Sequence, residues 1–247
     1  MAMPGARRGG TQPAMRIGLY VAPGSAVAAA AGLSMRRLVE ELGAVTVAID
    51  QQLASPSLSC GGVIVLGAFS FQAGGPASGG ELEGPLRAVA AFARAGGPVL
   101  GLGAGFQILC ELGLLPGRIT PGVGADPRLP APAAASHLRV EGRPTPFTSA
   151  IPAGRVMRLP PVDAPAPAAY ETDDAEALEA RGQVIFRYCD AAGGAAAGAP
   201  IRPTHGRSIA GVCDATGGVV GLLANPGGDG QQLLRSLRMH LGAARAV

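Results

Sequence analysis

Residues 98–117, PVLGLGAGFQILCELGLLPG, decide the fold of this chain. An apolar run at 98–102 predicts a buried strand, and 106–112 predicts a helix, with a tight turn of glycines between them. Turns of the form small–x–nucleophile–x–small hold a catalytic serine or cysteine on a strained elbow. Gly101 and Gly105 fit this pattern, but the tip residue, Gly103, has no side chain that could attack a substrate. The stretch therefore predicts the backbone of a nucleophile elbow without its nucleophile.

Two other interpretations of the turn were open on the residues alone. A dinucleotide-binding turn needs the pattern G-x-G-x-x-G, and the chain has Phe106 at the last position. The plainer alternative is a tight strand-to-helix turn with no role in catalysis. On the turn alone, this plain interpretation is favoured over both functional ones.

The rest of the first half alternates predicted strands with predicted helices. Strands are expected at 15–21, 45–50 and 62–67, and helices at 28–42 and 82–95. In the first helix, Leu33, Leu38, Val39 and Leu42 are expected on the buried face. Such alternation predicts a three-layer α/β fold with a mainly parallel central sheet.

The second half is richer in predicted strands. They are expected at 137–142, 154–160, 182–189, 208–214 and 218–226, followed by a helix at 231–241. They predict extra antiparallel strands on the sheet. Stretches 163–169 and 191–200, rich in alanine, proline and glycine, are predicted loops. One domain is expected over 15–247, after a disordered tail at 1–14 that makes Met15 a candidate start.

Composition excludes several classes of function. The chain has 247 residues, of which 48% are apolar and 15% charged, with a net charge of +3 and no lysine. Scattered arginines and few aromatics argue against a nucleic-acid surface. The four cysteines form no C-x-x-C pair, so no metal or redox site is expected. No apolar stretch of membrane-spanning length is visible, and a cytoplasmic protein is predicted.

The wider stretch resembles the segment G-V-C-N-G-F-Q-I-L-x-E-x-G-L-L-P-G of one family. That family is the glutaminase subunit of phosphoribosylformylglycinamidine synthase, a class I glutamine amidotransferase of purine biosynthesis. The resemblance covers nearly the whole chain after the tail. Further matching stretches are 23–25, 65–71, 137–141, 145–148, 156–160, 186–189 and 209–212. It implies a flavodoxin-like three-layer fold and no cofactor.

The same resemblance implies where the catalytic residues of the family would fall. Gly103 stands at the nucleophilic cysteine, and Asn225-Pro226-Gly227 stand at the family's His-Pro-Glu. An asparagine amide cannot shuttle a proton at neutral pH, and glycine offers no carboxylate. A central A-H-G-E-G stretch is replaced near 162–166. We therefore expect no catalytic residues in this chain.

What remains of the family's site is predicted to be a vestigial pocket. The family's P-G-G oxyanion turn is replaced by Leu66-Gly67-Ala68, and the asparagine after its cysteine by an alanine. The vestigial pocket and oxyanion loop comprise Gly67, Ala68, Phe69, Ala104, Gly105, Phe106 and Gln107.

No other residue is expected to replace the lost nucleophile or base. Cys110 lies seven positions past the tip, so its sulfur should be about 10 Å away by helix rise, and it is predicted to be a core residue. His137, His205 and His240 are each predicted to be structural or to face solvent.

The leading hypothesis is a catalytically silent homologue of the glutaminase subunit. The resemblance implies a synthetase partner that uses ATP and delivered ammonia, and glutamine is a candidate ligand. Two alternatives follow it: a sensor of glutamine or a nucleotide in the vestigial pocket, and a residual glutaminase with relocated catalytic residues.

Overall fold

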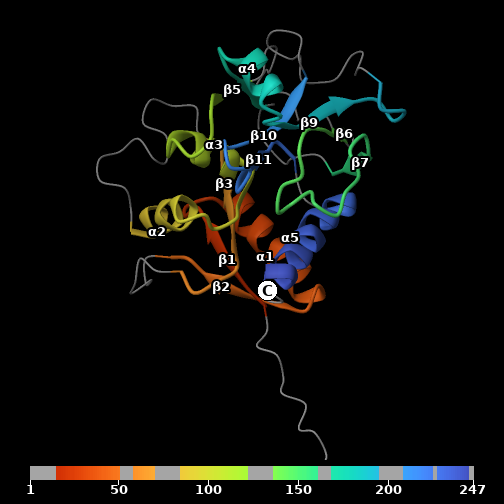
Figure 1. The fold of residues 1–247 in the computed structure, drawn as a ribbon. Helices are drawn as coiled ribbons and strands as arrows, with labels where there is room; N and C mark the ends of the chain where they lie inside the picture. Colours follow the sequence, from red (N-terminus) through yellow and green to blue (C-terminus); the bar gives the residue numbers. More distant parts are fainter. Residues whose placement is uncertain are drawn as a thin grey trace, which may run out of the picture.

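A computed structural model describes residues 15–50, 58–69, 84–121, 136–160, 168–194, 208–224 and 227–244. These residues form a nine-stranded sheet in the order β2-β1-β3-β4-β11-β10-β9-β6-β7 (Figure 1). Its parallel part consists of β1 (Met15–Val21), β2 (Ala44–Ala48), β3 (Gly62–Gly67), β4 (Val99–Gly103) and β11 (Val219–Leu222).

Four antiparallel strands extend the sheet beyond β11. They are β10 (Ile209–Cys213), β9 (Val184–Cys189), β6 (Ser136–Val140) and β7 (Val156–Leu159). Strand β11 joins the two parts, because it pairs in parallel with β4 and antiparallel with β10. The predicted α/β class is confirmed, including the antiparallel extension.

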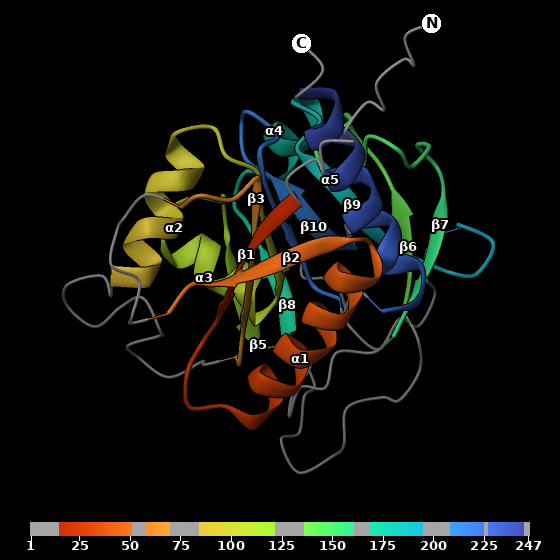
Figure 2. The same cartoon turned by 90° about the horizontal axis from the view of Figure 1, so that it is seen from below.

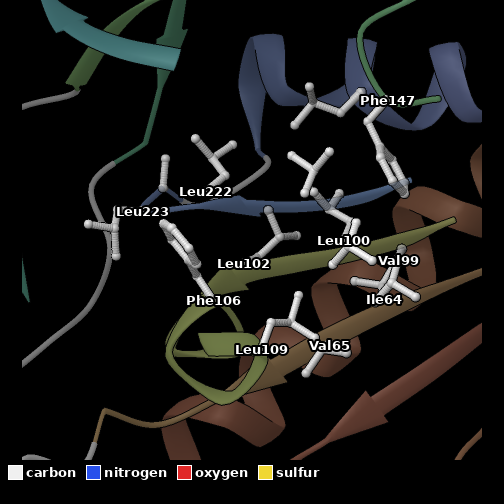
Figure 3. Close-up of a cluster of buried hydrophobic side chains, with 14 of the residues drawn as sticks. Ile64, Val65, Val99, Leu100, Leu102, Phe106, Leu109, Phe147, Leu222 and Leu223 are labelled. Carbon is white, nitrogen blue, oxygen red and sulfur yellow. The ribbon is translucent and has the colours of Figure 1, made fainter. Parts of the chain in front are cut away.

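Helices cover both faces of the parallel part, which gives three layers (Figure 2). Helices α1 (Ala26–Glu41) and α5 (Gln231–Ala244) lie on one face, and α2 (Gly84–Arg94) and α3 (Ala104–Glu111) lie on the other. The central strands are apolar on both sides because both of their faces are buried. Ile64 and Leu100 illustrate this: both are fully buried in the cluster of Figure 3.

The prediction for the buried face of α1 was partly wrong. Leu33 is 61% exposed, and the residues that face the sheet are Ala28, Gly32, Met35 and Val39. The reason is the close approach of α1 to β1. A Cβ at position 32 would lie 2.8 Å from Cγ2 of Val21, so small residues rather than leucines face the strand there.

Three short elements were not predicted from the sequence. Strands β5 (Arg118–Pro121) and β8 (Ala168–Glu171) form a separate antiparallel pair, and α4 (Ala175–Ala180) follows. The predicted loop at 163–169 is wrong at its end, because Ala168 and Ala169 begin β8. Pairing with a strand about 50 positions earlier creates β8, and local composition does not encode such a contact.

The remaining part of that loop, 163–167, lies outside the described residues, as do the predicted tail at 1–14 and positions 195–200 of the second loop. The beginning of the second loop is a turn, as predicted. There the Asp190 carboxylate accepts backbone N–H bonds from Ala192 (2.9 Å) and Gly194 (2.8 Å).

Candidate functional site

The predicted elbow exists as a sharp junction between β4 and α3. Strand β4 ends at Gly103 and the helix begins at Ala104, two positions earlier than expected. Gly103 has φ of 55° and ψ of −118°, a backbone conformation that costs other residues about 1–3 kcal/mol. Glycine therefore relieves the strain that a nucleophile would impose at this tip.

The flanking glycines let the helix approach the sheet. A Cβ at position 105 would lie 1.9 Å from the carbonyl oxygen of Val65 on β3. A Cβ at position 101 would lie 2.7 Å from the carbonyl oxygen of Gly105. No side chain fits either position, so the spacing of these glycines follows from packing, whatever residue stands at the tip.

Phe106 anchors the first turn of α3. Its ring covers Gly221 of β11, where a Cβ would lie 2.1 Å from Cδ2 of the phenylalanine. The ring also stacks on Tyr170 of β8, with ring centroids 5.3 Å apart and planes 17° apart. The Tyr170 hydroxyl donates to the carbonyl oxygen of Pro116 (2.9 Å), in the segment between α3 and β5. Tyr170 thus connects strand β8 both to the first turn of α3 and to the segment that follows this helix.

The predicted oxyanion loop lies beside the elbow. Gly67 ends β3 and is paired in register with Gly103 at the end of β4. A Cβ at position 67 would lie 3.6 Å from the Ala104 methyl group and 3.0 Å from Cδ1 of Ile108. Ala68 and Phe69 follow directly and are half-buried. The structure thus places the beginning of the predicted loop next to the elbow tip.

Gln107 is buried in α3, one turn past the tip, and is 5% exposed. Its side-chain amide donates to the Glu111 carboxylate (2.8 Å) on the next turn of the same helix. This bond satisfies a buried polar group and gives Gln107 a structural role.

The positions of the family's base and its orienter follow β11, the neighbour of β4. Asn225 and Pro226 lie outside the described residues. Gly227 has an extended backbone, with φ of −62° and ψ of 171°, so its conformation would accept any residue. The space beside Gly227 is too small for a side chain, because a Cβ at this position would lie 2.9 Å from Cγ of Pro160.

Three contacts not predicted from the sequence fix the chain on either side of this segment. Before it, the Tyr188 hydroxyl donates to the carbonyl oxygen of Leu223 (3.0 Å). After it, the Asp229 carboxylate, in the short helix η2 (Gly228–Gly230), accepts from the backbone N–H of Arg158 on β7 (2.8 Å). The third is the contact of Gly227 with Pro160. All are long-range contacts, which leave no local signal in the sequence.

Cys110 has none of the features of a replacement nucleophile. Burial, assisted by the neighbouring Glu111 carboxylate, raises the pKa of its thiol to about 12. The thiol lies 3.8 Å from the carbonyl oxygen of Pro116 and packs against the core. A thiol of that pKa carries almost no thiolate at neutral pH.

The histidines and the other cysteines that the structure describes lie outside β4 and α3, which form the elbow. His137 lies on β6 and His240 is exposed on α5, whereas His205 falls outside the described residues. Burial raises the pKa of the Cys60 and Cys213 thiols. Within the described ranges, no three His, Cys, Asp or Glu residues lie close enough to hold a metal ion. Nor is any described helix long and apolar enough to span a membrane.

Comparison with known proteins agrees with this geometry. The chain matches the CobB/CobQ-like glutamine amidotransferase domain over residues 63–236, and it belongs to that family. Phosphoribosylformylglycinamidine synthase subunit PurQ of Nitrobacter winogradskyi is 38% identical over 173 residues, which cover 64% of this chain and 70% of the relative. The same subunit of Thermomicrobium roseum is 37% identical over 188 residues, covering 71% and 76%.

A solved structure narrows the assignment further. One chain in the solved structure of PurLQS from Thermotoga maritima has a similar fold, with a TM-score of 0.69 and 25% sequence identity. The match covers 92% of this chain and 99% of that chain. Among the glutamine amidotransferases, the chain is therefore a PurQ homologue, of the glutaminase-subunit type found in phosphoribosylformylglycinamidine synthase. The resemblance found in residues 98–117 is confirmed.

Proposed function

We propose that this chain is a catalytically silent PurQ-type subunit that binds an ammonia-using synthetase subunit in purine or purine-like biosynthesis. The observation that carries the proposal is the glycine at the elbow tip, with φ of 55°, at the position where the resemblance places the family's nucleophile. Gly103 is paired in register with Gly67 at the start of the predicted oxyanion loop, and a glycine has no side chain that could form a covalent bond to glutamine.

The loss extends beyond the nucleophile. Amide hydrolysis of this kind needs a nucleophile, a base and an orienting group, which act as a unit. Asparagine at 225 and glycine at 227 replace the other two by the resemblance. Pro160 fills the space into which a side chain at 227 would extend. In this chain, a side chain at 227 would therefore need Pro160 to move, which supports the absence of an orienting group there.

The partner is proposed from the relatives. They are subunits of phosphoribosylformylglycinamidine synthase, and one solved neighbour is the PurLQS assembly. A silent subunit would hold the synthetase subunit in its active conformation while free ammonia supplies the nitrogen. As part of a nucleotide-biosynthetic enzyme, it would act in the cytoplasm.

Two measurements on purified proteins test the proposal. The chain alone should release no glutamate from glutamine, and it should co-purify with the synthetase subunit of its source and raise that subunit's ammonia-dependent activity. Release of glutamate would contradict the proposal that the chain is catalytically silent. The Cys110→Ala variant would then show whether that thiol is responsible. A chain that neither binds the synthetase nor changes its activity would overturn the subunit role.

One observation favours a second candidate function, a sensor of glutamine or a purine ribonucleotide. Gly67, which begins the predicted oxyanion loop, is paired with Gly103 at the elbow tip, which supports a retained pocket at this end of the sheet. A sensor would show a rise in melting temperature with glutamine or a purine ribonucleotide. No shift with either ligand would exclude this role, while leaving the docking role open.

A further inference from the structure

Four charged side chains form a continuous line on one face of the antiparallel strands. Arg139 on β6 lies directly opposite Arg187 on β9, and like charges in this arrangement destabilise a sheet. Glu141, directly after β6, supplies the counter-charge. One of its carboxylate oxygens accepts from Nε of Arg139 (2.8 Å) and the other from Nε of Arg187 (2.8 Å). One carboxylate thus holds both arginines on the sheet.

The fourth charge, Glu179, lies on α4, outside the nine-stranded sheet. Its carboxylate accepts from Nη2 of Arg187 (2.6 Å), so this guanidinium links Glu141 to α4. Both members of the pair are partly buried, with 18% of the Arg187 side chain and 32% of the Glu179 side chain exposed. Salt screens such a pair less than it screens a fully exposed one, so the pair helps to hold α4 against β9.

Helix α4 follows β8, and β8 pairs with β5. Residues 118–121 and 168–180 contain these three elements and are here called the strap. In the described part of the chain, β5 and β8 pair with each other and not with the nine-stranded sheet. A two-stranded sheet is marginally stable alone in water, so the position of the strap depends on its contacts with the rest of the molecule. The buried Leu178 supplies an apolar contact, and the Glu179–Arg187 pair supplies an ionic one.

Tyr170 brings the strap into contact with α3. Its ring stacks on Phe106 at the start of the helix, and its hydroxyl donates to the carbonyl oxygen of Pro116 beyond the end of the helix (2.9 Å). The thiol of Cys110 lies 3.8 Å from the same carbonyl oxygen. Because the hydroxyl and the thiol share one acceptor, a reagent that reaches Cys110 reports whether Tyr170 is in place.

We propose that the strap opens as one unit, without global unfolding, and that the Glu179–Arg187 pair is the ionic contact that holds it closed. Tyr170 and Glu179 belong to one short segment, so loss of the ion pair at α4 also lowers the free energy needed to lift Tyr170 from Phe106. Arg187 keeps its bond to Glu141 when the strap opens, so the sheet stays intact. Local opening of this kind costs less free energy than unfolding of the whole domain. It is independent of whether the chain is catalytically silent.

The rate at which iodoacetamide alkylates Cys110 measures this opening. Each cysteine is followed separately by mass spectrometry of its peptide. The ratio of the rates in the denatured and native chains gives the free energy of opening at Cys110. This free energy should be smaller than the free energy of global unfolding measured with denaturant. Equal values would show that Cys110 reacts only after the domain unfolds, and would overturn the proposal.

Two variants test the role of the ion pair. Glu179→Gln removes the charge that reaches Arg187 and should raise the alkylation rate of Cys110 about threefold, the effect expected for a partly exposed ion pair. Glu171→Gln is the matched control. It removes the same charge from an ion pair with Arg118 (3.0 Å) that lies within the strap, so it should leave the rate unchanged. A Glu179→Gln variant that reacts at the native rate, or a Glu171→Gln variant that reacts as fast as Glu179→Gln, contradicts the proposal.

Salt provides a second measurement of the same contact. Sodium chloride at about 1 M shortens the Debye length to about 3 Å. It should accelerate alkylation of Cys110 more in the native chain than in Glu179→Gln, because the variant has already lost the charge that salt screens. The reagent is uncharged, so its own reactivity responds equally in both proteins. Equal acceleration in the two proteins would show that the strap is not held by this ion pair.

Discussion

Gly227 lies directly against Pro160, so that any side chain at 227 would begin 2.9 Å from Cγ of that proline. The position at which the resemblance places an orienting glutamate is therefore closed by packing.

Gly227→Glu should destabilise the native chain by about 1–3 kcal/mol, the usual cost of overpacking. The same change in a Pro160→Ala background should cost measurably less, because Cγ and Cδ of the proline are gone. Denaturant unfolding of the four proteins gives the coupling energy of the two sites. Equal costs in both backgrounds would show that Pro160 does not close the site.

Restoring the nucleophile alone should not restore activity. Gly103→Cys should release no glutamate from glutamine, because the resemblance places Asn225 and Gly227 where the family has its base and orienter, and it should lose about 1–3 kcal/mol of stability through its backbone conformation. Gly113→Ala is the matched control: it too has a positive φ, 64°, with no atom within 4 Å of the added Cβ, so it isolates the backbone cost. Measurable turnover by Gly103→Cys would refute the silent-subunit proposal.

The sequence predicted the elbow because its causes are local. A glycine at the tip and small residues on either side leave a pattern that can be read without the rest of the fold. The order of the strands in the sheet was harder to predict from the sequence. The position of β11 beside β4 follows from pairing between residues about 120 positions apart.

The errors have the same physical origin. Leu33 was expected on the buried face because the apolar pattern groups it with Leu38, Val39 and Leu42, but the helix packs through Gly32 on Val21 and Leu33 is exposed. Strand β8 could not be predicted from its alanine-rich sequence, because the contacts that stabilise it are long-range: pairing with β5 and stacking of Tyr170 on Phe106. Local secondary-structure propensity predicts poorly where long-range contacts determine whether a strand or a buried face forms.

Gly105→Ala should be among the most damaging single changes in this protein. Its methyl group would meet a backbone oxygen of β3 at 1.9 Å, which no side-chain rotation relieves. We expect a loss above about 4 kcal/mol, in the range of severe core defects, or no folded protein. Gly242→Ala, at a helical position with no atom within 4 Å of the added Cβ, should instead stabilise by about 0.5–1 kcal/mol. Thermal unfolding compares them.

Stability should fall in alkali through Cys110. Its folded pKa of about 12 exceeds the ordinary value of 9.0, so the folded state keeps the proton that the unfolded chain releases. The resulting stability is complete below pH 9 and is lost as pH rises toward 12, by up to about 1.4 kcal/mol per pH unit. Denaturant unfolding at several pH values should show a shallower loss for Cys110→Ala. Identical slopes would contradict the burial of this thiol.

The tight seating of α3 on β3 has an evolutionary consequence. Two glycines at this junction are demanded by steric exclusion alone, so selection for folding preserves them whether or not a reaction takes place above them. A lineage can discard its chemistry and still carry the signature of the enzyme it came from. In chains with this elbow, ancestry is recorded by the glycines that flank the tip, and present-day activity by the single residue between them.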